Sequence, residues 1–205
     1  MKKIIYVILF GALGFFIQCQ EEMDTTFLIT NDSVGKLNKI NYTAQLDSIF
    51  ALDSIVGVDG FQMKRNRQNG KDPLGITKDS SNTKRWTTSK KIQIYEKGGK
   101  HLLTLTQSND SLPKIENVRI MDSRFVTAKG IGLQSTFKDV KAQYGVKRVI
   151  TTMNNVVIYL KESNLYVTID KKELPPSLRY ATSTNIEAVQ IPDKAKLKYL
   201  MVGWD

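Results

Sequence analysis

From residue 90 onward, the chain is a succession of short segments in which apolar residues alternate with polar ones. A period of two is typical of β-strands that bury one face and expose the other. The pattern predicts strands at residues 91–95, 102–105, 115–121, 124–127, 146–152, 156–160, 165–169 and 197–202. Gly98 and Gly99 indicate a hairpin turn between the first two of these strands. Residues 161–164 indicate another between the strands at 156–160 and 165–169. Strands joined by short turns pair antiparallel, so we expect a mainly antiparallel sheet.

Two short stretches have helical spacing instead. In the first, apolar residues recur at i, i+4, i+7 and i+8, namely at Tyr42, Leu46, Ile49 and Phe50. The second covers residues 136–144, where Thr136 and Asp139 have the spacing of a capping box. The sequence therefore predicts an α+β fold that is mostly antiparallel β-sheet with two short helices.

A weak internal β-α-β repeat is also visible. In the first copy, residues 35–37 are followed by a helix and by a strand near residue 55. The second copy has the same order, with residues 130–133, a helix and a strand near residue 146. The two copies are offset by about 95 residues. Between them, residues 59–89 carry seven basic residues against three acidic ones and show no apolar period. A stretch of this length and composition predicts a mobile basic loop.

The N-terminus has the parts of a secretory signal. Lys2 and Lys3 precede an apolar run at residues 4–17, and Cys19, the one cysteine of the chain, follows it. This run is shorter than the roughly 20 residues of a membrane-spanning helix. An ordinary signal peptide cut near Ala12 or Gly14 is the alternative, but that cut would truncate the apolar core.

Residues 16–19, Phe-Ile-Gln-Cys, resemble the lipobox that ends the signal peptide of bacterial lipoproteins in Gram-negative cells. The resemblance implies that residues 1–18 are removed and that Cys19 becomes a lipidated N-terminus carrying a diacylglyceryl group and palmitate. Residues 19–26 would then be a tether and residues 27–205 a single β-rich domain. Several acyl chains on one cysteine anchor a protein stably in a membrane. We therefore expect a lipid-anchored protein of the outer membrane in the cell envelope.

Two acidic residues follow the cysteine almost directly. Glu21 and Glu22 are similar to the signal that marks lipoproteins for the outer face in one group of Gram-negative bacteria. The alternative is a solvated tether that is acidic without such a role. Both a surface-exposed and a periplasmic location therefore stay open.

The second helix carries a further resemblance. Thr136-x-x-Asp139-Val140-x-x-x-Tyr144-Gly145 is similar to the helix-opening motif of small outer-membrane lipoproteins with a β-lactamase-inhibitor-like module. This resemblance implies a binding or scaffold module rather than an enzyme. It also raises an inhibitor of a secreted enzyme as a further alternative.

The chain is basic, with 30 lysines and arginines against 20 aspartates and glutamates. Removing Lys2 and Lys3 with the signal lowers the formal charge from +10 to about +8. A basic surface suits anionic partners, and for a secreted protein we expect an envelope protein or an anionic glycan and no nucleic acid.

Two clusters are candidate ligand-binding residues. Lys84, Arg85 and Trp86 place an indole beside two cations, which suits an anionic sugar. The alternative is that Trp86 packs where the loop rejoins the sheet. Arg124 and Lys129 form the second cluster beside Asp122, where ion pairing at a turn is the alternative.

No catalytic residue, metal site or cofactor is predicted. His101 is the one histidine and Cys19 is assigned to lipid, so the chain offers no Cys-His pair, histidine metal site or serine triad. Tyr159 and Tyr166 fit strand patterns, and Trp204 is expected to close the core. The leading hypothesis is a non-catalytic, lipid-anchored binding or scaffold module; an envelope hydrolase using carboxylates is the alternative from another class.

Overall fold

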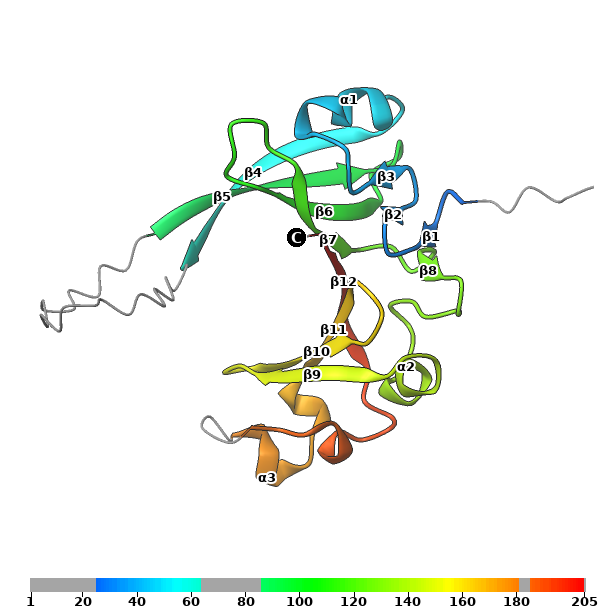
Figure 1. The fold of residues 1–205 in the computed structure, drawn as a ribbon, viewed down its shortest axis with the longest axis vertical. Helices are drawn as coiled ribbons and strands as arrows, with labels where there is room; N and C mark the ends of the chain where they lie inside the picture. The colour runs from blue at the N-terminus through cyan, green and yellow to red at the C-terminus, as the bar shows by residue number, and fades with distance from the viewer. Residues whose placement is uncertain (1–24, 64–85, 181–184, 205) are drawn as a thin grey trace, which may run out of the picture.

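The computed structural model describes residues 25–63, 86–180 and 185–204, and for residues 58–63 and 86–90 it describes the backbone. Its largest element is an antiparallel sheet with the strand order β4-β5-β6-β7-β12-β11-β10-β9 (Figure 1). The strands are β4 (Ser54–Met63), β5 (Trp86–Tyr95), β6 (His101–Gln107), β7 (Ile115–Ile120), β9 (Val146–Thr151), β10 (Asn155–Leu160), β11 (Leu165–Asp170) and β12 (Leu197–Gly203). The predicted α+β fold, mainly antiparallel sheet, is confirmed.

A second, small sheet has the order β3-β2-β1-β8. Its strands are β1 (Leu28–Ile29), β2 (Ser33–Val34), β3 (Leu37–Asn38) and β8 (Val126–Thr127). β1 and β8 pair in parallel, with Leu28 opposite Val126. Directly before these strands, the rings of Phe27 and Phe125 meet edge to face, with centroids 5.1 Å apart. This sheet therefore joins the start of the domain to its middle.

The internal repeat extends over both halves of the large sheet. In the first half, a 3-10 turn (Thr43–Gln45) and α1 (Leu46–Ile49) precede β4 to β7; in the second, α2 (Phe137–Gln143) precedes β9 to β12. The halves join where β7 pairs with β12, with Val118 opposite Val202. The repeated unit is thus a helix followed by four antiparallel strands, larger than the β-α-β unit that the sequence indicates.

The second helix begins at the predicted capping box. The hydroxyl of Thr136 accepts a hydrogen bond from the Asp139 amide, and the Asp139 carboxylate accepts one of 2.7 Å from the Thr136 amide. Phe137 and Val140 are completely buried against the core. The box satisfies amides that the first helical turn leaves without partners.

We expect Thr136→Ala to lower the free energy of unfolding by about 1 kcal/mol, the usual contribution of an N-cap side chain. Urea unfolding measures this change, and Thr136→Ser, which keeps the hydroxyl, serves as the control. Equal losses for both variants would mean that the methyl group, and not the cap, matters.

Two boundaries differ from the sequence predictions. Residues 59–63 and 86–89, expected in the basic loop, continue β4 and β5, with Asp59 opposite Lys90 and Met63 opposite Trp86. Backbone pairing with a neighbouring strand holds them extended although they lack apolar alternation. The structure also has a further short helix beyond the two predicted, α3 (Pro176–Arg179), whose first turn contains Pro176. Proline fits that position because the amide it lacks has no helical partner there.

The helices and the small sheet lie on the outer side of the curved large sheet (Figure 1). The buried strand residues, such as Ile94, Val118 and Ile158, form a core with Phe137 of α2. Trp204 is buried as predicted, and its indole N–H donates to the carbonyl of Asn31 at 2.9 Å. Within the described ranges, no helix has the length and apolar character needed to cross a membrane.

Candidate binding face

One continuous row of side chains runs across the large sheet from β5 to β9. The strand registers place its members directly opposite one another on seven neighbouring strands. In strand order, the members of this inner row are Gln93, Thr104, Arg119, Met201, Tyr166, Tyr159 and Arg148. Residues directly opposite each other project from the same face of a sheet, so the row forms one surface.

The inner row lies on the face of the sheet opposite to the core. Val118 and Ile120, on either side of Arg119, are at most 1% exposed, and Leu200 and Val202 beside Met201 are completely buried. Arg119 and Met201 themselves are half-buried. The alternation of the strands thus directs apolar side chains outward to the helices and polar or aromatic ones to the inner face.

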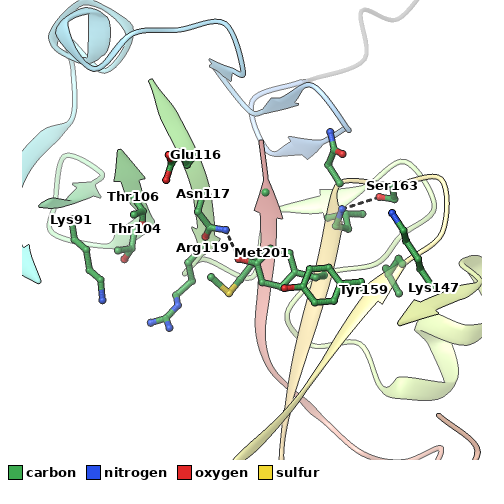
Figure 2. Close-up of a pocket in the computed structure, with 15 residues that line it drawn as sticks. Lys91, Thr104, Thr106, Glu116, Asn117, Arg119, Lys147, Tyr159, Ser163 and Met201 are labelled. Atoms are coloured by element: carbon green, nitrogen blue, oxygen red, sulfur yellow. Dashed lines mark hydrogen bonds between the residues drawn. The ribbon is translucent and has the colours of Figure 1, made fainter. Parts of the chain in front are cut away.

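A pocket of about 450 Å³ lies along this row (Figure 2). Residues of seven strands line it, from Lys91 on β5 to Lys147 on β9, together with Ser163 and Asn164 of the β10–β11 turn. Its volume falls in the range of known ligand pockets. Because β7 and β12 run through its middle, both halves of the repeat contribute to it.

Aromatic and cationic side chains order this surface. The rings of Tyr159 and Tyr166 stack with centroids 5.2 Å apart, and the Arg148 guanidinium lies 4.5 Å from the centroid of Tyr159. Arg119 lies 3.9 Å from the centroid of Tyr199 in the same manner. Cross-strand contacts of this kind hold side chains in place before any ligand binds.

The pocket has more positive than negative side chains. Lys91, Arg119 and Lys147 line it, against Glu116 as the one acidic lining residue. Among the side chains that the structure describes, no carboxylate lies within ion-pair distance of these three cations. Elsewhere on the sheet, by contrast, Lys198 is paired with Asp170 at 2.8 Å. Hydrogen bonding between these two raises the pKa of Lys198 and lowers the pKa of Asp170.

The described lining of the pocket includes none of the candidate residues that the sequence indicates. Cys19, Lys84 and Arg85 are outside the described residues. Trp86 is the first residue of β5, and the structure describes its backbone. Lys129 donates a hydrogen bond to the carbonyl of Gln143 at 2.9 Å. In the described part of the chain, no three His, Cys, Asp or Glu side chains come together to form a metal site.

Arg124 takes part in the ion pairing that was the alternative to its binding role. Its guanidinium donates to both oxygens of Glu96, at 3.0 and 2.8 Å, and to Asp122 at 2.7 Å. The Asp122 side chain is completely buried and also pairs with Lys100 at 3.1 Å. Burial raises the pKa of Asp122, but the hydrogen bonds from Arg124 and Lys100 outweigh it and lower the pKa to about 2. Arg124 and Asp122 thereby join their own turn to the hairpin turn between β5 and β6.

The inner row was missed by the sequence prediction, which treated Tyr159 and Tyr166 as ordinary strand residues. Within a single strand, the alternation of apolar and polar residues identifies the side chains that face away from the core. It does not give the strand order, which brings β7 next to β12 and aligns Arg119 with Met201 and Tyr166.

Comparison with known proteins adds information on the fold alone. No family model and no curated protein matches this sequence. The structure is similar to the crystal structure of the uncharacterized protein yfeY from Escherichia coli, with a TM-score of 0.52 and 12% sequence identity. The match covers 86% of this chain and 99% of that one. At this identity the likeness shows a shared fold.

Proposed function

We propose that this chain is a lipid-anchored, non-catalytic binding or scaffold module of the outer membrane, which holds its partner on the inner row. The observation that carries the proposal is the row itself, which spans seven strands and is rich in tyrosine and arginine. These residue types dominate the energetics of binding surfaces because they combine contact area with hydrogen bonds. The Cys19 signal supports the anchor.

The acid–base properties of the described carboxyl groups favour binding over hydrolysis. A general acid that works near neutral pH needs a raised pKa. In the described part of the chain, every carboxyl group with a shifted pKa has it lowered, namely Glu96, Asp122, Asp139, Asp170 and Asp193. Hydrogen bonds received from neighbouring groups keep them ionised. Carboxyl groups that stay ionised suit structural contacts better than the general-acid step of an envelope hydrolase, which is the alternative function.

A steric block of the inner row tests the binding function. Gly203 lines the pocket opposite Asn117, and a Cβ there would meet Tyr166 at an ordinary contact distance of 3.4 Å. We expect Gly203→Leu to project an isobutyl group into the pocket and to reduce binding of the detergent-solubilised full chain to detergent-washed envelope fragments at least tenfold. Co-sedimentation measures this binding.

Gly57 supplies the matched control. It lies on the edge strand β4, and a Cβ there would have no neighbour within 4 Å. Gly57→Leu makes the same change in the same sheet away from the pocket, so binding should stay unchanged. Binding that survives Gly203→Leu would show that the inner row does not hold the partner.

The anchor is tested separately. We expect Cys19→Ala to abolish incorporation of labelled palmitate and to release the chain from the outer-membrane fraction. Protease treatment of intact and lysed cells then separates the surface-exposed from the periplasmic location. A Cys19→Ala chain that fractionates like the wild type would rule out the lipid anchor.

A further inference from the structure

We infer that the pocket on the inner row binds an acidic oligosaccharide, whose anionic groups contact Arg119, Lys91 and Lys147. The inference rests on the proposed binding function and adds the class of ligand and the residues that recognise it. It also moves the anion site from the Lys84–Arg85–Trp86 segment to the middle of the large sheet.

The first argument is charge complementarity. Three cations line the pocket, and no described carboxylate pairs with any of them. Arg119 is half-buried and fixed against Tyr199, so its guanidinium is held in place without a charged partner. A fixed guanidinium can bind a carboxylate, sulfate or phosphate group through two parallel hydrogen bonds. An anionic ligand would supply the missing partner.

The second argument is the length of the surface. Lys91 and Lys147 lie six strand spacings apart in the sheet order. At about 4.8 Å per spacing, the path between them along the sheet is on the order of 30 Å. Arg119 lies between them, so the three cations are spread along the path rather than gathered at one point. This spacing fits a chain of repeated anionic units better than a single small anion.

The third argument separates a saccharide from an acidic peptide. Extended peptides bind sheets mainly by adding a strand at a free edge. Seven strands line the pocket, and six of them, from β5 to β10 in the order of the sheet, are hydrogen-bonded to neighbours on both sides. The edge strand β9 contributes Lys147 alone, so most of the pocket has no free backbone edge to offer. What the pocket offers instead is side-chain hydroxyl and amide groups, from Thr104, Thr106, Asn117, Tyr159 and Ser163. A ligand rich in hydroxyl groups matches this lining.

The tyrosines act as fixed hydrogen-bonding groups. Tyr159 is held between Arg148 and Tyr166, and the Asn117 amide donates a hydrogen bond to the Tyr166 hydroxyl. Ring faces occupied in this way leave the phenol hydroxyl of Tyr159 as the group that meets a ligand. Fixing these side chains before binding lowers the entropy cost of association.

Two other places on the molecule offer less to a ligand. One, a hollow of about 490 Å³ beside α2, contains Lys129 and Asp139, but both are engaged within the chain, by the Gln143 carbonyl and by Thr136. The buried Asp122 pairs with Arg124 and Lys100. The pocket on the inner row differs from these two places because three cations line it and none of them has a carboxylate partner among the described residues.

Calorimetric titration of the full chain in detergent tests the inference, with oligogalacturonate, its uncharged methyl ester and a sulfated heparin oligosaccharide as probes. We expect at least one of the two acidic probes to bind and the methyl ester to bind at least tenfold more weakly. Arg119→Gln should weaken binding of the acidic probe at least tenfold, and binding should fall with rising salt. Lys194→Gln, the loss of an exposed lysine outside the pocket, is the matched control and should leave it unchanged.

Each contrary outcome has a distinct meaning. Equal binding of oligogalacturonate and its ester would overturn the role of charge. Binding of a poly-glutamate peptide without binding of either acidic saccharide would overturn the ligand class in favour of an acidic peptide. If no probe binds while Gly203→Leu still abolishes envelope binding, the inference fails and the proposed function stands. If Gly203→Leu has no effect on envelope binding, the proposed function itself fails at this face.

Discussion

Asp122→Ala is expected to lower the free energy of unfolding by about 3 kcal/mol at neutral pH. The buried Asp122 carboxylate accepts hydrogen bonds from the Arg124 amide and guanidinium and pairs with Lys100. Removing one partner of a buried ion pair typically costs about 3–5 kcal/mol. Arg124 and Lys100 are partly exposed and Arg124 keeps Glu96, so the lower end of that range applies. Urea unfolding followed by tryptophan fluorescence measures the loss.

The same carboxyl group predicts a pH dependence. Its pKa is about 2 in the folded chain, below the ordinary value of 3.8. A lowered folded-state pKa stabilises the fold above the unfolded value, and the stabilisation is lost as the pH falls through the folded value. After allowance for solvent screening at the exposed partners, this contribution is about 1–2 kcal/mol.

Asp122→Asn, which keeps the shape and removes the charge, isolates this effect. The gap in unfolding free energy between the wild type and Asp122→Asn should be constant above about pH 4 and should narrow between about pH 4 and pH 2. A gap that does not change with pH in this window would mean that the ionised carboxylate does not stabilise the fold.

Gly35→Ala is expected to cost about 2–4 kcal/mol of unfolding free energy. Gly35 has a φ of 55°, in the left-handed region, and a Cβ there would press into the Thr26 carbonyl oxygen and approach Phe125 Cε1 to 3.2 Å. A left-handed alanine costs about 1–2 kcal/mol, and overpacking against backbone adds about 1–3 kcal/mol. The same unfolding measurement gives the value.

Gly130 provides the comparison from the second half of the repeat. Its φ of 78° is also left-handed, but a Cβ there would meet nothing within 4 Å. Gly130→Ala should therefore cost only the conformational share, about 1–2 kcal/mol. Equal losses at both positions would show that the close approach of Gly35 to Thr26 and Phe125 does not limit the packing of the small sheet.

The local elements of this fold could be predicted because their signals lie within a few residues. Gly98 and Gly99 form the expected hairpin turn, and both have positive φ. Thr136 and Asp139 form the expected capping box. The ends of β4 and β5 could not be predicted in this way. Apart from Phe61, Met63 and Trp86, their residues are polar or glycine, and the pairing of the two strands with each other keeps them extended.

The amino-acid sequence by itself determined the strand alternation, the helix that starts at Thr136 and the repeat of about 95 residues, because each depends on local spacing. Tertiary structure alone decided that β7 lies beside β12 and that the described helices and the small sheet lie on the outer side of the large sheet. Those two decisions align Arg119, Tyr166 and Tyr159 on one face, although they come from strands far apart in the chain. Contacts between distant segments set them, and alternation within one strand carries no information about which strand will be its neighbour.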